Sequence, residues 1–243
     1  AKGGSDTFGG IDMTRPTDGN AARTFIIGEN SQTYTAERTV LPFKINKFET
    51  TYALWYAVRT DAEGRGYVFA NPGQGGSEGR RGGEPTDEDK YFPVTAINWY
   101  DAIVWCNALS EIENKTPCYS YKGKVLRDST DTASCDLSEC DWNADGYRLP
   151  TEAEWEWAAQ GGTQRRTYPV PWGTVNHDEY IWRASNSGDK THQILEKMKH
   201  PDFSLYDIGG NVWEWCWDWY TDTTPAGGIN PTGAQSGNKH AIR

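Results

Sequence analysis

The sequence predicts an α+β fold with short strands, about three helices and a high share of irregular chain. Three segments combine helical spacing of apolar residues with a capping residue at the start. They cover residues 51–60, 99–112 and 151–160. Short β-prone runs, which lie at 23–27, 40–48 and 213–219, are separated by stretches rich in Gly, Ser and Asp.

Each predicted helix begins beside a side chain that can accept a backbone N–H. The first follows a Thr-Thr pair. Asn98 precedes the second, and Asp101 three residues later approximates a capping box. Thr151 and Glu154 form a capping box for the third. These local signals fix where the helices start, while residues 1–22 are expected to be a loose N-terminal segment.

Composition excludes several classes of partner. The 243 residues carry a net charge of −10, so nucleic acid and anionic membrane surfaces are not expected as partners. No apolar run is long enough for a transmembrane helix. Only 36% of residues are hydrophobic, yet 12 are tryptophan, which predicts a core built from few, large indoles.

A run of alternating tryptophans follows residue 212. In an extended strand every second side chain points to the same face. The indoles are therefore expected to form one wall of an aromatic core, and the intervening side chains to point to the other face. The indoles are Trp213, Trp215, Trp217 and Trp219, and the others are Glu214, Cys216, Asp218 and Tyr220.

Two carboxylates flank the turn that precedes these tryptophans. Asp207 and Glu214 lie on either side of Gly209-Gly210, with main-chain carbonyls between them. Hard oxygen donors grouped around a turn suit calcium better than zinc or copper. The alternative is that Asp207 caps a turn and Glu214 pairs with an arginine. Sequence alone leaves both interpretations open.

A second stretch matches a calcium-loop pattern in full. Its residues have the spacing D-x-[DN]-x-[DN]-G-x5-E. They are Asp141, Asn143, Asp145, Gly146 and Glu152. A proline lies inside the loop, no helix is predicted before it, and the glutamate falls in the first turn of the third predicted helix. A helix–loop–helix calcium site is therefore not expected here.

The five cysteines contain no CxxC pair. Cys135 and Cys140 lie close enough in the chain to pair in an oxidising compartment. Cys106 and Cys216 fall in core-like patterns, which predicts buried thiols.

Five motifs, in order, resemble the formylglycine-generating-enzyme-like (sulfatase-modifying factor) family. They are KFETTYALW, PVTAINWYDAIVWCN, GYRLPTEAEWEWAAQGG, NSGDKTH and LYDIGGNVWEWCWDW. The resemblance implies an elaborated C-type-lectin-like domain with bound structural calcium. That single domain would cover residues 23–243 and lack its C-terminal strands.

The resemblance also implies metal ligands. A second calcium site of the family would fall on the Asp207 and Glu214 side chains and the carbonyls of Gly210 and Val212. Asn186, with the carbonyl of Ser187, resembles part of the family's first calcium site. The loop after this pair departs from the pattern of the enzymes.

The enzymes of this family hold copper with two cysteines that follow an RGGSW-like strand. This sequence stops at Ile242-Arg243, where that strand would start, and none of its cysteines occupies the ligand position. No copper and no catalytic residues are therefore expected in this chain.

The amino-acid sequences of these motifs resemble those of surface proteins of Treponema-type spirochaetes, including the variable proteins of diversity-generating retroelements. The resemblance implies a non-enzymatic ligand-binding protein at the cell surface or outside the cell, with a lipid anchor as one form of attachment and with a protein or carbohydrate ligand of unknown identity. The alternative is a copper-dependent oxidase that converts a sulfatase cysteine to formylglycine, truncated before its catalytic cysteines.

Overall fold

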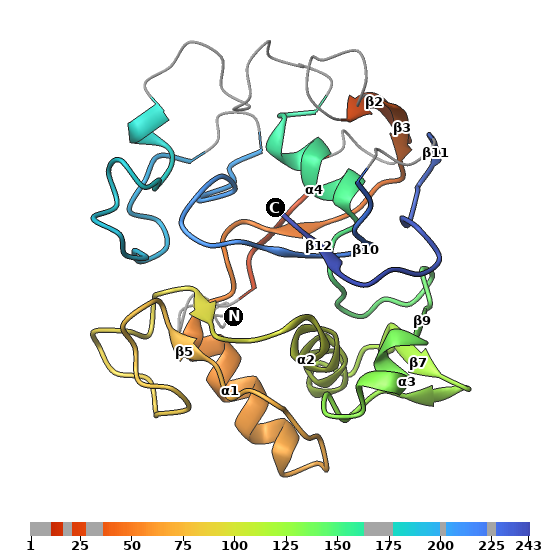
Figure 1. Cartoon of the computed structure of the whole chain (residues 1–243), viewed down its shortest axis with the longest axis horizontal. Coiled ribbons are helices and arrows are strands. Elements are labelled where there is room, and N and C mark those ends of the chain that lie inside the picture. The colour runs from red at the N-terminus through yellow and green to blue at the C-terminus, as the bar shows by residue number, and fades with distance from the viewer. Residues whose placement is uncertain (1–10, 17–20, 28–35, 163–176, 200–202, 223–226) are drawn as a thin grey trace, which may run out of the picture. The chain divides into compact units, whose positions relative to one another are not determined.

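A computed structural model describes residues 11–16, 21–27, 36–162, 177–199, 203–222 and 227–243. The described chain divides into two compact units (Figure 1). Unit 1 holds residues 50–149, and unit 2 holds residues 11–49 and 150–243. The predicted α+β class with short strands is confirmed. This division leaves the single domain over 23–243 as a prediction, and residues 1–10 and 17–20 of the N-terminal segment lie outside the described residues.

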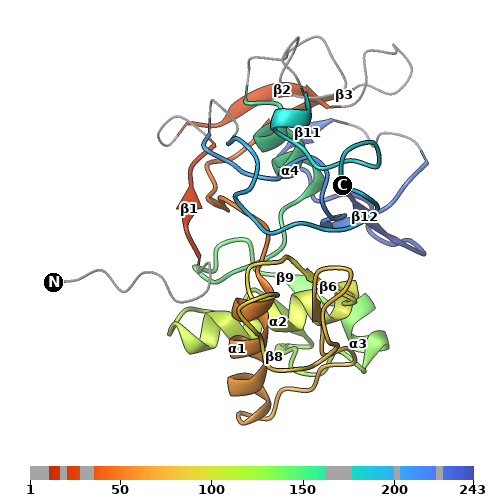
Figure 2. The ribbon, with the colours of Figure 1, turned by 90° about the vertical axis from the view of Figure 1, so that its left-hand side faces the viewer.

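Two helices form the centre of unit 1. Helix α1 spans Tyr52–Glu63 and helix α2 spans Trp99–Ile112, and both start at the predicted caps. The helices cross each other (Figures 1 and 2), and the Trp55 and Trp105 rings stack between them with centroids 5.6 Å apart. Stacked indoles bury much apolar area with few residues, so this part of the predicted tryptophan core is confirmed.

Short strands complete unit 1. Strands β5 (Gln74–Gly75) and β6 (Val94–Thr95) pair, and β7 (Tyr119–Tyr121) lies between β8 (Lys124–Val125) and β9 (Glu139–Cys140). A short helix α3, Thr132–Asp136, precedes β9. Cys135 in α3 and Cys140 in β9 are not joined by a disulfide. Cys106 and Cys216 are buried, as predicted.

Asn107 ties helix α2 to the β7–β8 hairpin. Its amide nitrogen donates to the carbonyls of Tyr119 (2.8 Å) and Leu126 (3.0 Å), and its amide oxygen accepts the Tyr119 N–H (3.0 Å). The side chain is fully buried. One amide therefore satisfies three backbone groups that have no water available.

The described residues of unit 2 form three small sheets. Strand β2 (Arg23–Ile27) is antiparallel to β3 (Ala36–Val40), and β11 (Gly228–Ile229) runs parallel on the other side of β3. Strands β2, β3 and β11 lie together in Figure 2. Strand β1 (Met13–Thr14) pairs with β4 (Ile45–Asn46). Strand β10 (Trp215–Trp219) pairs with β12 (His240–Ile242).

The predicted strand over 40–48 is wrong. Strand β3 ends at Val40, and the chain resumes pairing only at Ile45. Pro42 lies in the gap, and proline has no N–H to give to a strand ladder.

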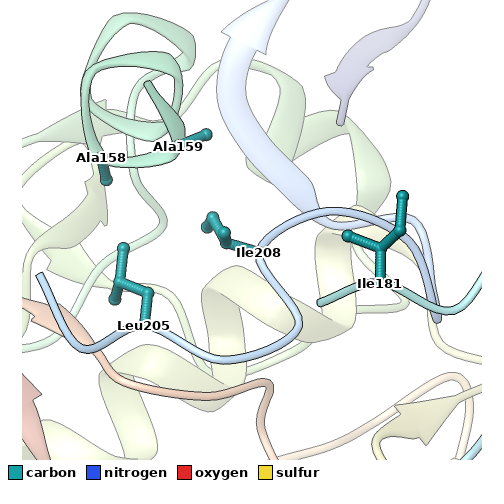
Figure 3. Packing of buried hydrophobic residues seen from close by; sticks show 5 residues of the cluster. All are labelled: Ala158, Ala159, Ile181, Leu205 and Ile208. Atoms are coloured by element: carbon teal, nitrogen blue, oxygen red, sulfur yellow. The ribbon is translucent and has the colours of Figure 1, made fainter. Parts of the chain in front are cut away.

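Helix α4, Glu152–Ala159, packs on the core of unit 2. Thr151 and Glu154 form the predicted capping box. The helix presents Ala158 and Ala159 to a buried apolar cluster that includes Leu205 and Ile208, which point toward the helix in Figure 3. Because Ala158 and Ala159 are small, the segment that carries Leu205 and Ile208 can approach the helix backbone closely.

The prediction that the indoles of β10 face the core is wrong. Cys216 and Asp218 are buried at 0% and 5% exposure, whereas the neighbouring indoles on β10 are only partly buried and Trp213 is 75% exposed. The Asp218 carboxylate accepts the Glu152 N–H (2.8 Å) at the start of α4. A carboxylate at a helix N-terminus is stabilised by the free N–H groups and the helix dipole, and this contact turns the polar face of β10 inward.

None of the described helices is long and apolar enough to cross a membrane.

Replacing Asn107 by alanine is expected to lower the free energy of unfolding by about 2–4 kcal/mol. The Tyr119 N–H and the Leu126 carbonyl lose the Asn107 partner, and the Tyr119 carbonyl keeps only the Leu126 N–H. Urea unfolding followed by tryptophan fluorescence measures the change. Asn143→Ala is the matched control, since Asn143 is exposed in the same unit and its loss should change stability by about 0.5 kcal/mol or less. Equal losses in the two variants would contradict the assigned role of Asn107.

Candidate functional site

The candidate site is the loop between Leu205 and strand β10. Its backbone takes left-handed conformations at Asp207 (φ 54°), Gly210 (φ 96°) and Asn211 (φ 56°). Such conformations are disfavoured for residues with a side chain, and surrounding contacts must hold them. The loop is therefore a tightly specified piece of irregular chain.

Asp207 is buried with one unused oxygen. Its side chain is 2% exposed. One carboxylate oxygen, Oδ2, accepts the Leu195 N–H (3.2 Å), while Oδ1 has no hydrogen-bond partner. Burial raises the pKa of this carboxyl to about 6. A buried acceptor with a free lone pair is the kind of group that a cation or water would satisfy.

Glu214 contacts an indole rather than an arginine. Its Oε2 accepts the Trp155 indole N–H from helix α4 (2.8 Å). The carboxyl group is enclosed by protein, and burial, followed by the negative charge of Asp207, raises its pKa to about 7. The alternative interpretation, in which Glu214 pairs with an arginine, is therefore wrong.

The Gly210 carbonyl has a direction fixed by the backbone. The Asn211 N–H donates to the Trp182 carbonyl (2.9 Å). In a planar trans peptide the C=O points opposite to the N–H, so the Gly210 carbonyl points away from that Trp182 carbonyl. A Cβ at position 210 would lie 2.0 Å from the Trp182 oxygen, so only glycine fits here.

Glu49 is a third buried carboxylate, and the sequence analysis missed it. Its Oε2 accepts the Asn211 side-chain amide (2.7 Å), and the carboxylate also accepts the Val212 N–H. Its Oε1 has no partner. Burial, then the charges of Asp207 and Glu214, raise the Glu49 pKa well above its usual range. No local sequence signal marks this glutamate, because its contacts lie 162 positions away.

The donor chemistry fits a hard cation. Asp207 and Glu214 are close enough for their charges to interact, and the carbonyls of Gly210 and Val212 belong to the same loop. Over the described part of the chain, no three His, Cys, Asp or Glu side chains form a metal-binding group. A cation here would therefore need main-chain carbonyls as well as carboxylates, which is typical of calcium sites.

Asn186 and Ser187 form a separate turn whose polar groups are already engaged. The Asn186 amide oxygen accepts the Arg183 N–H (2.8 Å), and its nitrogen donates to Asp178 (3.1 Å) and to the Ile181 carbonyl (3.0 Å). The Ser187 carbonyl lies 2.9 Å from the His192 Nε2. This turn shows no orphan oxygen, and a cation at this first site stays a prediction.

The calcium-loop pattern over 141–152 is used for other contacts. Asp141 accepts the Asn143 N–H (2.9 Å), and Asp145 accepts the Thr116 N–H (2.8 Å). Glu152 lies in α4, where it pairs with Arg243 (2.7 Å). These separate contacts agree with the expectation that the pattern does not form a helix–loop–helix site.

Comparisons with known proteins identify a family and several relatives of this chain. The model of the sulfatase-modifying factor enzyme 1-like domain matches residues 9–241. The chaperone protein LppX of Paenibacillus barcinonensis is 32% identical over 206 residues, which cover 75% of this chain and 64% of LppX. The formylglycine-generating enzyme of Bos taurus is 38% identical over 160 residues, which cover 60% of this chain and 39% of the enzyme.

Among solved structures, Treponema denticola variable protein 1 superposes with a TM-score of 0.75 and 32% identity. The superposition covers 98% of this chain and 85% of the variable protein. The chain thus spans less than two thirds of the length of these two curated relatives, and the larger part of the variable protein.

The free energy of unfolding of the metal-free protein is expected to fall as pH rises from about 4 to about 7. In the folded state Asp207 and Glu214 keep their protons to pKa values of about 6 and about 7, above their usual values of 3.8 and 4.5. The unfolded chain releases these protons first, so ionisation favours unfolding in this window. Urea titrations with a chelator measure the slope.

The double variant Asp207→Asn with Glu214→Gln should flatten that slope. The remaining part is due to buried Asp218, whose pKa is raised to about 7 by burial, and to Glu49, whose pKa burial also raises. A metal-free protein whose stability rises between pH 4 and pH 7 would contradict the assigned burial of these carboxyls.

Replacing Gly210 by alanine is expected to reduce stability by about 1–3 kcal/mol more than replacing Gly66. Both glycines have positive φ, 96° and 87°, but a Cβ at Gly66 meets nothing within 4 Å. The difference between the two variants in urea unfolding isolates the contact with the Trp182 carbonyl. Equal losses would show that this carbonyl can move freely.

Proposed function

Since the chain belongs to the sulfatase-modifying factor enzyme 1-like domain family, we propose that it is a non-enzymatic ligand-binding protein of that family, displayed at the cell surface. The observation that carries the proposal is the similarity to Treponema denticola variable protein 1 over nearly the whole chain. We infer a binder of the diversity-generating-retroelement kind, with a protein or carbohydrate ligand. A lipid anchor at that surface is part of this proposal.

The exposed tryptophan beside the candidate site supports a binding role. Trp213 is 75% exposed, and Tyr220 at the other end of strand β10 is also exposed. Large aromatic side chains on a surface are the residues that contribute most often to binding energy. Strand β10 supplies a rigid base for them, because its own Cys216 and Asp218 are buried.

We propose calcium as the structural cation of this loop. Asp207 and Glu214 would hold it with their side chains, and Gly210 and Val212 with their carbonyls. When bound, calcium supplies the positive charge that two buried carboxylates otherwise lack. The unpartnered Asp207 Oδ1 supports the assignment.

A second candidate function is oxidation of a substrate cysteine to formylglycine. The 38% identity with the bovine formylglycine-generating enzyme favours it. That reaction would require a copper-binding pair of thiolates. The described thiols Cys118 and Cys135 are instead buried, and burial raises their pKa to about 11 and about 12.

The protein is expected to form no aldehyde on a cysteine peptide in the presence of copper and oxygen. Mass spectrometry of the peptide measures the product, with the bovine enzyme as the positive control. Aldehyde formation would instead establish the oxidase.

On a glycan array and against purified envelope proteins, the wild type should bind a ligand that Trp213→Ala binds more weakly.

A further inference from the structure

We propose that Glu49 is a positioning residue of the cation site: its buried carboxylate holds the 210–212 backbone in the shape that offers carbonyl ligands. This inference rests on the proposed calcium site. It adds a residue that binds the loop rather than the ion.

The segment directly before Glu49 is held by two other parts of unit 2. The preceding strand β4 pairs with β1. The Lys47 N–H donates to the Asp12 carbonyl (2.9 Å), and the Lys47 carbonyl accepts the Tyr206 N–H (2.7 Å). The second bond ties this segment to the residue directly before Asp207. Glu49 is therefore fixed relative to the loop that it contacts.

The carboxylate collects two donors from the middle of the loop. The Asn211 amide and the Val212 N–H both point to it. The same Asn211 side chain donates to the His192 carbonyl (3.1 Å) and accepts the His192 N–H (2.8 Å). Asn211 thus keeps its left-handed backbone because three contacts hold its side chain, one of them to Glu49.

The position of Glu49 makes the residue a support and not a ligand. Its Oε2 is occupied by the loop, and although its Oε1 has no partner, Glu49 forms no three-carboxylate metal cage with Asp207 and Glu214 in the described chain. The charges of Asp207 and Glu214 act on Glu49 and favour its protonated form. Ionised Asp207 and Glu214 ligands beside a third acidic side chain favour a divalent cation over a monovalent one, because the greater charge offsets more of their mutual repulsion.

The test compares calcium affinity with metal-free stability in the variants Glu49→Gln and Glu49→Asp. Isothermal titration with calcium is expected to show affinity about 10–100-fold weaker in Glu49→Gln. Its urea midpoint in chelator should stay close to that of the wild type, because glutamine matches the protonated carboxyl that the raised pKa of Glu49 favours in the metal-free protein. Glu49→Asp, which keeps the charge and shortens the reach, should recover part of the affinity. Glu37→Gln, an exposed charge loss on β3, is the control and should match the wild type.

The outcomes separate the two proposals. If Asp207→Asn abolishes calcium binding and Glu49→Gln leaves it unchanged, the role of Glu49 is overturned and the calcium site stands. If affinity and metal-free stability fall together in Glu49→Gln, the residue is merely structural and the inference is also overturned. If the wild type binds no calcium, both proposals fail.

Discussion

The burial of Glu49, Asp207 and Glu214 is the constraint on which the rest of unit 2 depends. None of the three forms an ion pair with a described Lys, Arg or His side chain, and two of them keep an oxygen without a partner. Enclosed charges of one sign destabilise a fold unless they are protonated or matched by a cation. The metal-free loop meets this constraint by binding protons, which is why the pKa values of all three carboxyls are raised.

The same constraint explains the orientation of strand β10. Glu214 and Asp218 both reach helix α4, one through the Trp155 indole and the other through the Glu152 N–H. Two polar contacts to one helix fix which face of the strand is inward. The indoles then occupy the outer face, where Trp213 is exposed. A surface rich in aromatic side chains is thus a consequence of polar burial beneath it.

The sequence determined the helices well because their signals are local. The capping box of Asn98 and Asp101 lies within four residues, and the structure starts α2 there. The alternation of side chains in β10 predicted which residues share a face of the strand. It did not predict which face is buried, because a repeat of two residues fits either orientation of the strand equally well. Glu49 could not be found, because its role depends on a contact with Asn211, far away in the chain.

Trp213 lies between Val212 and Glu214, so the candidate cation site and the exposed aromatic surface share one stretch of backbone. The peptide groups of Glu214 and Arg243 exchange two hydrogen bonds, at 2.7 and 3.0 Å, which fixes the chain just after Trp213. On the other side, Glu49 holds the Val212 N–H. A residue clamped at both neighbours presents its side chain with little entropy left to lose on binding. A cation bound by the same neighbours would stiffen this presentation further, which would couple the proposed calcium binding to the proposed ligand binding without any contact between the two.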